Sequence, residues 1–211
     1  MSFAKIALIA GLMASQTLWA GVLETKPGQN KIKDVAVATS GRTSVEGRQV
    51  DLGFVGAGLR QKKKALFNFN VYVAQLLADL PVKFVRVESE ALTSLDNLQT
   101  VALQLTFLRG VDAETVMESF KEALTANKVD FSTGAVKSFL DAVSASGDAA
   151  EGKTLTLVAE RLADGVEAVT YEGTNGKPTT IRGTQGFIKN IFAIWLGTPA
   201  DGGLEKLKTA L

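Results

Sequence analysis

The sequence predicts an α+β domain in which helices are layered on an antiparallel β-sheet. Three observations support this prediction. Strand-like segments outnumber helical ones in the first half of the chain, amphipathic helices come in pairs later on, and the βαβ alternation of a parallel sheet is missing. About 190 residues follow the N-terminal segment described next, which is enough for one domain with a sizeable core.

The first twenty residues have the pattern of a secretory signal peptide. Lys5 precedes an apolar run from Ile6 to Ala14 that is too short to span a bilayer, and the segment ends on the small residue Ala20. We therefore expect residues 1–20 to be removed after Ala20 and the protein to reach the periplasm of a Gram-negative cell. A cut one or two residues away, or a buried first helix, is the alternative.

Composition excludes several classes of function. The chain has no His and no Cys, which removes Ser-His-Asp and Cys-His catalysis, disulfides, and the common zinc, haem and iron-sulfur sites. We expect no cofactor and no metal. The 23 basic residues lose only Lys5 on cleavage, which leaves 22 against 22 acidic ones. This neutral balance argues against nucleic acid and against charge-driven membrane adhesion, and no later segment is apolar enough to span a membrane.

The first predicted elements are strands. Thr25–Lys31 is polar and includes Pro27 and Gly28, so we expect a flexible N-terminal segment over residues 21–31 and an ordered domain over residues 32–211. Two alternating segments predict a first hairpin with a turn at Ser40-Gly41-Arg42. The segment Gly56-Ala57-Gly58-Leu59-Arg60 reads as a tight turn, because glycine tolerates positive φ. The hairpin strands are expected at Ile32–Ala38 and Val45–Leu52, and a long strand, apolar on both faces, at Phe67–Leu77.

The later segments alternate between helix and strand patterns. Pro81 ends the long strand, and Asp112 stands where a helix N-cap is expected. Thr184 is expected to cap a helix with a wide apolar stripe that Gly197 ends. The predicted elements are a short acidic helix or loop at Glu88–Leu98, a strand at Thr100–Leu108, a helix from Asp112 to Asn127, a helix at Thr133–Ser144, a hairpin of Thr154–Leu162 with Val166–Glu172, a strand at Thr179–Arg182, and a last helix with Leu204, Leu207 and Leu211.

The Gly56–Arg60 segment is the one place where ligand chemistry is suggested. A guanidinium is a planar fork of donors suited to carboxylates, phenolates and enolates. Arg60 also begins the polar run Gln61–Lys64, so a solvated side chain is the alternative. Tyr72 is the nearest hydroxyl on the following strand, and its alternative is a core position with the hydroxyl bonded to backbone. The pattern predicts an anion site and does not identify a reaction.

Three segments together resemble the chalcone isomerase-like proteins, in particular their exported bacterial branch. They are Gly-Ala-Gly-Leu-Arg60 followed by Val-Tyr72-Val-Ala, the segment Phe-Leu-Arg-Gly-Val111 that enters a helix, and Phe-Ala-Ile-Trp-Leu-Gly197 before the last helix. The resemblance covers nearly all of the chain after residue 20. It implies an open-faced β-sandwich, an antiparallel sheet covered on one side by helices, with a ligand cleft between the two layers.

The resemblance also implies a set of catalytic positions. Plant chalcone isomerases close a chalcone to a flavanone with an Arg that stabilises the oxyanion, and Arg60 matches that residue. The hydrogen-bonding Thr, Tyr, Asn and Thr of those enzymes fall on Phe67, Asp112, Ser119 and Ile194. Loss of one preorganised oxyanion donor costs about 100-fold or more in rate. We therefore expect no chalcone isomerisation and assign no catalytic residue.

Three hypotheses remain. The first is a periplasmic, non-catalytic protein that binds a small amphipathic acid such as a fatty acid, with Arg60 and Tyr72 as ligand-binding residues, as the resemblance to fatty-acid-binding relatives implies. The second is an isomerase, an intramolecular lyase, that acts on a phenolic or enolisable substrate with Arg60 as electrophile. The third is a structural or partner-binding protein whose cleft is filled by its own side chains.

Overall fold

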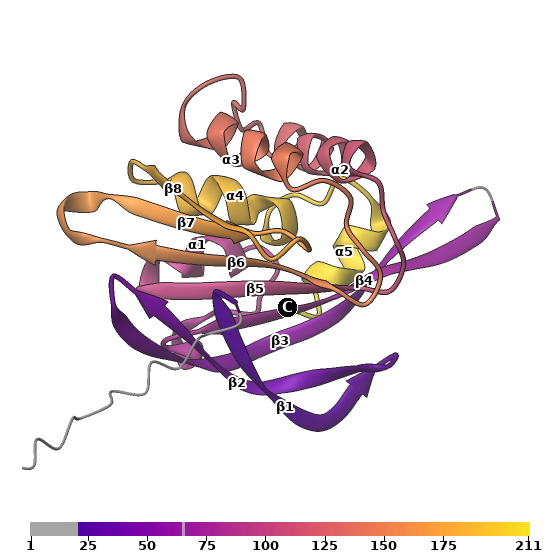
Figure 1. Cartoon of the computed structure of the whole chain (residues 1–211), viewed down its shortest axis with the longest axis horizontal. Coiled ribbons are helices and arrows are strands. Elements are labelled where there is room, and N and C mark those ends of the chain that lie inside the picture. The colour runs from indigo at the N-terminus through magenta and orange to yellow at the C-terminus, as the bar shows by residue number, and fades with distance from the viewer. Residues whose placement is uncertain (1–20, 65) are drawn as a thin grey trace, which may run out of the picture.

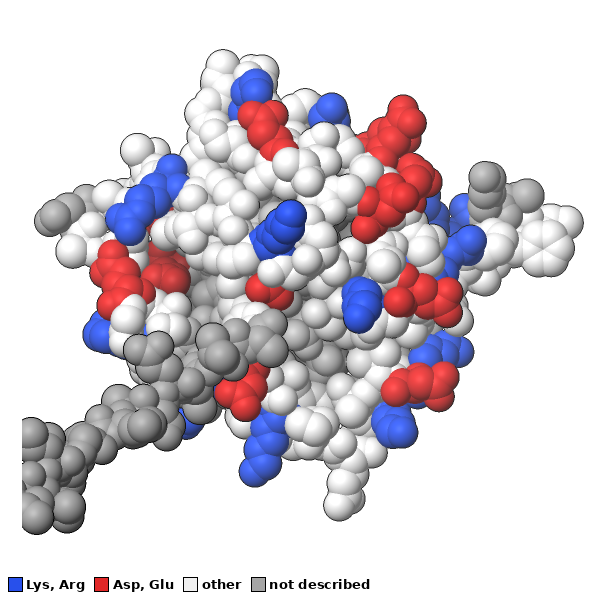
Figure 2. Space-filling view, in the orientation of Figure 1, with Lys and Arg blue, Asp and Glu red and all other residues white. Residues whose placement is uncertain are grey.

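The computed structural model describes residues 21–64 and 66–211 (Figure 1). The predicted signal peptide lies outside the described residues. Basic and acidic side chains are interspersed on the face shown in Figure 2, as the even charge balance suggests. Within the described residues, no helix combines the length and the apolar character needed to cross a bilayer.

The sheet has eight strands in the order of the sequence, and each strand pairs antiparallel with the next. Such a meander needs only short connections, because neighbours in sequence are neighbours in space. The strands are β1 (Leu23–Ile32), β2 (Val35–Val45), β3 (Arg48–Lys64), β4 (Phe67–Ala78), β5 (Thr100–Phe107), β6 (Thr154–Arg161), β7 (Glu167–Glu172) and β8 (Pro178–Gly183).

The main helices lie on one side of the sheet (Figure 1). An antiparallel sheet with helices on one face is the predicted open-faced α+β arrangement, which is confirmed. The helices are α1 (Ala91–Ser94), α2 (Ala113–Ala126), α3 (Gly134–Ala145), α4 (Phe187–Leu196) and α5 (Gly202–Lys208), with short 3₁₀ segments η1 (Pro81–Lys83), η2 (Leu95–Asn97) and η3 (Ala163–Gly165). The Asp112 cap is confirmed, whereas α4 begins after Gly186, with φ of 95°, and not at Thr184.

The main core fills the space between the sheet and the helices. Alternate residues of β5 point into it, as their period of two predicts, and so does the apolar stripe of α4. A second, smaller apolar cluster lies on the other sheet face, against β1 and β2. The sheet curls there, so that Glu46 at the β2–β3 turn pairs with Arg182 on β8 at 3.5 Å. The curl brings the first strands close to the last ones.

The expectation of a flexible segment at residues 21–31 is wrong. Leu23–Ile32 forms β1, which pairs with β2 and carries a bulge on either side of Pro27. Most of its side chains are exposed, so it lacks the apolar alternation that marks a half-buried strand. An edge strand is held by backbone pairing on one side and tolerates proline at an irregularity. Side-chain pattern alone therefore could not reveal it.

The first predicted turn is also misplaced. Gly41 lies inside β2, and the chain turns instead at Glu46 and Gly47, whose φ values are 46° and 79°. Two consecutive positive φ values describe the tight two-residue loop that matches the twist of a hairpin. Gly41 is small for a packing reason, because a Cβ there would lie 2.9 Å from Leu77 Cδ2.

The Gly56–Arg60 segment is not a turn but the middle of β3. Its glycines have no positive φ, and they face the C-terminal helix α5 and the chain end. A Cβ on Gly58 would lie 2.7 Å from Ala210 Cβ, and one on Gly56 would overlap the Leu211 carbonyl. The missing side chains let α5 pack directly on the backbone of β3. The Gly-x-Gly pattern therefore reflects the close packing of α5 and the chain end on β3.

Candidate functional site

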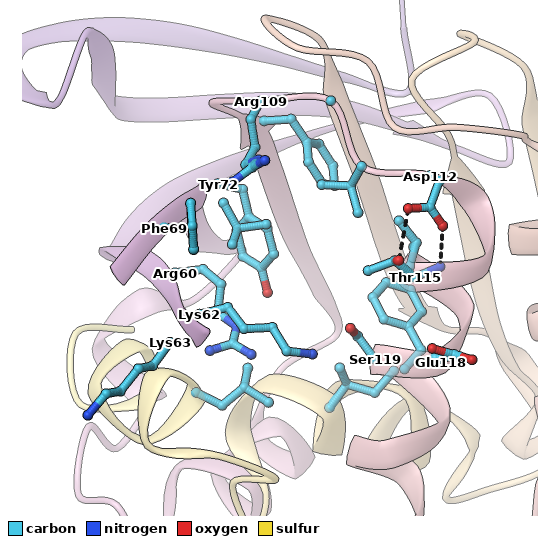
Figure 3. Close-up of a pocket in the computed structure, with 18 residues that line it drawn as sticks. Arg60, Lys62, Lys63, Phe69, Tyr72, Arg109, Asp112, Thr115, Glu118 and Ser119 are labelled. Atoms are coloured by element: carbon cyan, nitrogen blue, oxygen red, sulfur yellow. Dashed lines mark hydrogen bonds between the residues drawn. The ribbon is translucent and has the colours of Figure 1, made fainter. Parts of the chain in front are cut away.

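A cleft of about 600 Å³ opens between the sheet and the helices, where β3, β4 and β5 meet α2 and the end of α4 (Figure 3). Its volume falls within the usual range for small-molecule sites. One wall is apolar, and its side chains come from β4, β5, α2, α4 and α5. The apolar wall consists of Val71, Phe107, Val116, Phe120, Ile194 and Leu204.

Arg60 lines this cleft and is buried, with only 5% of its surface exposed. The solvated alternative is therefore wrong for Arg60. Its Nη1 donates to Asp201 Oδ1 at 2.7 Å and to the Gln61 carbonyl at 2.6 Å, and its Nη2 donates to Asp201 Oδ2 at 2.5 Å. This bidentate ion pair fixes the plane of the guanidinium. Arg60 is thus held in place and largely neutralised by its own chain.

Asp201 is the residue that sequence reasoning missed. It is the N-cap of α5, and its Oδ1 accepts from the backbone N–H of Gly203 and of Leu204, both at 2.9 Å. Burial disfavours the charged carboxylate, but hydrogen bonds from Arg60 and the helix, with the charge of Arg60, outweigh burial and lower the pKa of Asp201. An Asp before a short apolar-periodic segment is an N-cap signal. Nothing in the sequence points from it to Arg60.

Tyr72 lies opposite Arg60 in the register of β3 and β4, and its side chain also lines the cleft. Its hydroxyl accepts a hydrogen bond from Trp195 Nε1 at 3.1 Å, so its bonded partner is a side chain and not backbone. Burial raises the pKa of Tyr72, and the charge of Arg60 acts in the opposite direction. Because Trp195 is the donor in that bond, the hydrogen of the neutral Tyr72 hydroxyl is left to donate into the cleft.

Further polar side chains line the same space, among them Lys62, Arg109 and the acidic Glu118. Figure 3 shows Lys62 reaching from β3 into the cleft toward Ser119 of α2. The one carboxylate within ion-pair range of Lys62 among the described residues is Glu122, at 3.9 Å, a long contact on the exposed side. Arg109 stands at another part of the wall, over the ring of Phe69 at 5.0 Å. The sequence alone places Lys62 in a polar, solvated run, because it cannot show which part of a strand borders a cleft.

The positions that the resemblance linked to catalysis are only partly brought together. Asp112, Ser119 and Ile194 line the cleft, whereas Phe67 is absent from its wall and 69% exposed near the end of the β3–β4 hairpin. The Asp112 carboxylate already accepts from the Thr115 N–H at 2.8 Å and from its hydroxyl at 2.9 Å. Ile194 has no polar group, so Ser119 alone keeps a hydroxyl free to face a ligand.

Comparison with protein families gives a direct result. The profile of the family described as chalcone isomerase-like matches residues 29–211. The chain belongs to the chalcone isomerase-like family. A search of the curated proteins finds no significant match. For this chalcone isomerase-like protein the family establishes the fold, and the contents of the cleft must be argued from its own residues.

Proposed function

We propose that this chalcone isomerase-like protein binds a small amphipathic acid, such as a fatty acid, in the cleft and does not transform it. The observation that carries the proposal is the composition of the cleft. An apolar wall built from β4, β5, α2 and α4 faces converging donors from Arg60, Tyr72 and Lys62. Apolar lining with a few placed polar groups is the usual composition of a small-molecule site.

The carboxylate end is assigned to the donors that the protein leaves unused. A guanidinium has five N–H groups, and three of those of Arg60 are taken by Asp201 and Gln61. The remaining two, the Tyr72 hydroxyl and the Lys62 ammonium are available. Because Asp201 balances the charge of Arg60, the positive charge that an acid requires must come from another cation of the wall. We assign it to Lys62, which reaches into the cleft beside Arg60, whereas Arg109 stands at another part of the wall. Arg60 and Tyr72 then orient the carboxylate by hydrogen bonds.

The tail is assigned to the apolar wall. Each buried CH₂ contributes about 0.8 kcal/mol, which corresponds to roughly a fourfold gain in affinity. Affinity for straight-chain acids is therefore expected to rise with chain length until the cleft is filled. Exported location is part of the proposal and rests on the N-terminal sequence alone.

An isomerase finds less support in the same cleft. At the four positions that family enzymes use, Phe67 is exposed and Ile194 is apolar. The Asp112 carboxylate is already occupied as the N-cap of α2, which leaves Ser119. Too few donors remain to stabilise an oxyanion in the way those enzymes do. The open volume likewise argues against a cleft filled by its own side chains.

Native mass spectrometry of the purified protein, before and after organic extraction, tests the proposal. We expect a co-purifying acid, and calorimetric titration of the extracted protein with acids of increasing length is expected to show rising affinity. The matched primary alcohols are expected to bind at least tenfold more weakly, because they lack the charge. An extracted protein that binds neither acids nor alcohols contradicts the proposal, and equal affinity for both contradicts the cationic anchor.

Two lysine variants locate the anchor. Lys62→Gln is expected to weaken acid binding about tenfold or more without changing the affinity for the alcohol. Lys121→Gln is the control, because Lys121 lies exposed on α2 outside the wall of this cleft. Equal effects of the two substitutions contradict a direct role for Lys62 and indicate only a change in overall charge.

A further inference from the structure

A buried carboxylate stands beside the start of β1, on the sheet face opposite the cleft. Glu172 of β7 is 8% exposed, and its Oε2 accepts a hydrogen bond from the backbone N–H of Val22 at 3.1 Å. None of the ion pairs among the described residues includes Glu172. An ionised carboxylate at this degree of burial is costly unless a cation or several donors face it.

Gly21 is packed against the same carboxylate. A Cβ on Gly21 would lie 3.1 Å from Glu172 Oε1, so the backbone of Gly21 lies next to the carboxylate. Neighbouring backbone nitrogens are at most about 3.7 Å apart, from standard bond lengths. The nitrogen of Gly21 therefore lies at most about 3.7 Å from the Val22 nitrogen, which is already bonded to Glu172. It is also the nitrogen that the predicted cut after Ala20 releases.

We propose that Gly21 is the first residue of the processed protein and that its α-ammonium binds the Glu172 carboxylate. The cut is a hydrolysis by a signal peptidase. Water adds across the Ala20–Gly21 peptide bond, Ala20 leaves with a carboxylate, and Gly21 keeps the nitrogen as an ammonium. An uncharged amide with one N–H thus becomes a cation with three. The ammonium is the counter-charge that Glu172 lacks before the cut.

The surrounding cavity supports this assignment. It has a volume of about 190 Å³, and both Gly21 and a second buried carboxyl, Glu160, line it. Burial raises the pKa of Glu160 to about 7, and Glu46 adds to the effect while the cations Arg48 and Arg182 oppose it. Among the described residues, this cavity wall contributes one acidic side chain, Glu160, and no basic one, and Glu172 lies next to Gly21 outside the wall.

The consequence is that processing completes the fold on this face. The ammonium ties the start of β1 to β7, over the second apolar cluster that includes Leu23 and Val158. A cut one residue earlier moves the ammonium one residue further from Glu172, whereas a cut after Gly21 would place it on Val22, whose nitrogen already lies 3.1 Å from Glu172 Oε2. This inference concerns the other sheet face and stands apart from the proposed function.

The position of the cut is measured first. The full chain is expressed in a Gram-negative host, and the periplasmic protein is analysed by intact mass and N-terminal sequencing. We expect a single product that begins at Gly21. A product that begins at another residue, or a chain that keeps residues 1–20, overturns the proposal.

A double-variant cycle then measures the ion pair. The processed protein is compared with the same chain preceded by Ser-Ala, with and without Glu172→Gln. The extension is expected to lower Tm by about 2 to 8 °C in the wild type, the shift expected when a domain of this size loses one ion pair. It is expected to have little effect in Glu172→Gln. Glu167→Gln is the matched control, since Glu167 is 3% exposed and binds the Ile188 N–H on the helix side. There the extension is expected to act as in the wild type.

An extension that leaves Tm unchanged in the wild type, or that lowers it equally in Glu172→Gln, refutes the pair. Should Glu172→Gln not fold, acetylation of the Gly21 amine in the wild-type protein takes its place. Acetylation removes the charge and adds only a small group, so it is expected to lower Tm within the same range. An acetylated protein with an unchanged Tm contradicts the proposal.

Discussion

Replacing Asp201 by Asn removes the charge that faces Arg60 and keeps a side chain able to cap α5. The side chain of Arg60 is 6% exposed and that of Asp201 is 34% exposed. Removing one partner of a buried pair costs about 3–5 kcal/mol, because the other charge is left uncompensated. Water reaches one side of this pair, so we take the lower end. Asp201→Asn is expected to reduce the free energy of unfolding by about 3 kcal/mol, or Tm by roughly 6–12 °C.

Urea denaturation followed by circular dichroism measures the effect, and two further variants divide it. Asp201→Ala also removes the N-cap and is expected to cost about 1 kcal/mol more. The double variant Arg60→Met with Asp201→Asn removes both charges and is expected to be more stable than Asp201→Asn alone. An Asp201→Asn protein within about 0.5 kcal/mol of the wild type refutes this account of Arg60.

The pH dependence of the same pair has a definite sign. The pKa of Asp201 is lowered in the folded protein, so the carboxylate binds fewer protons there than in the unfolded chain. Its contribution to stability is present above the unfolded pKa and is lost as pH falls through the folded one. Acid unfolding below about pH 4 is therefore expected to be less steep in Asp201→Asn. If stability falls with decreasing pH equally steeply in Asp201→Asn and in the wild type, the result contradicts the ion pair.

The remaining predictions concern packing, a buried hydrogen bond and a buried carboxyl. Gly58→Ala is expected to lose about 1–3 kcal/mol of unfolding free energy in urea, because its Cβ meets α5, whereas Gly110→Ala, with open space around it, is expected to lose less than about 0.5 kcal/mol. Trp195→Phe removes the donor to Tyr72 and is expected to cost about 1–3 kcal/mol by the same assay, and full stability of this variant contradicts the bond. Burial raises the pKa of Glu160 to about 7, so stability is expected to fall as pH rises from about 4.5 through 7, and urea denaturation across this range is expected to show a flatter profile for Glu160→Gln.

The elements that the sequence predicted well are those with strong periodicity. The alternation Val101, Leu103, Leu105 placed β5, and the spacing of apolar residues placed α2 to α4 within a few residues. Where signals were weak or shared, prediction failed. Edge strand β1 is polar, and Gly41 and Gly58 looked like turn residues although each is small because another element packs on it.

The candidate site was predicted in part. Arg60 and Tyr72 lie in one cleft, as the sequence suggested, and their ligand-binding role remains a prediction. The partner Asp201 lies 141 residues away from Arg60 along the chain, and no local pattern connects the two. Lys62 belongs to a run that reads as solvated, and only the position of β3 beside α2 turns it into the cleft.

The sequence by itself determined the chemistry available to this protein and the period of its elements. Without His or Cys, the cleft depends on Arg, Lys, Tyr and carboxylates, and periods of two and 3.6 made an antiparallel sheet with a helical layer. Only the tertiary structure decided that Arg60 is paired with Asp201, that Lys62 lines the cleft, and that Glu172 lies beside Gly21. The reason is physical. Local pattern reflects interactions between near neighbours, whereas the charge state and exposure of a side chain depend on what distant segments bring against it.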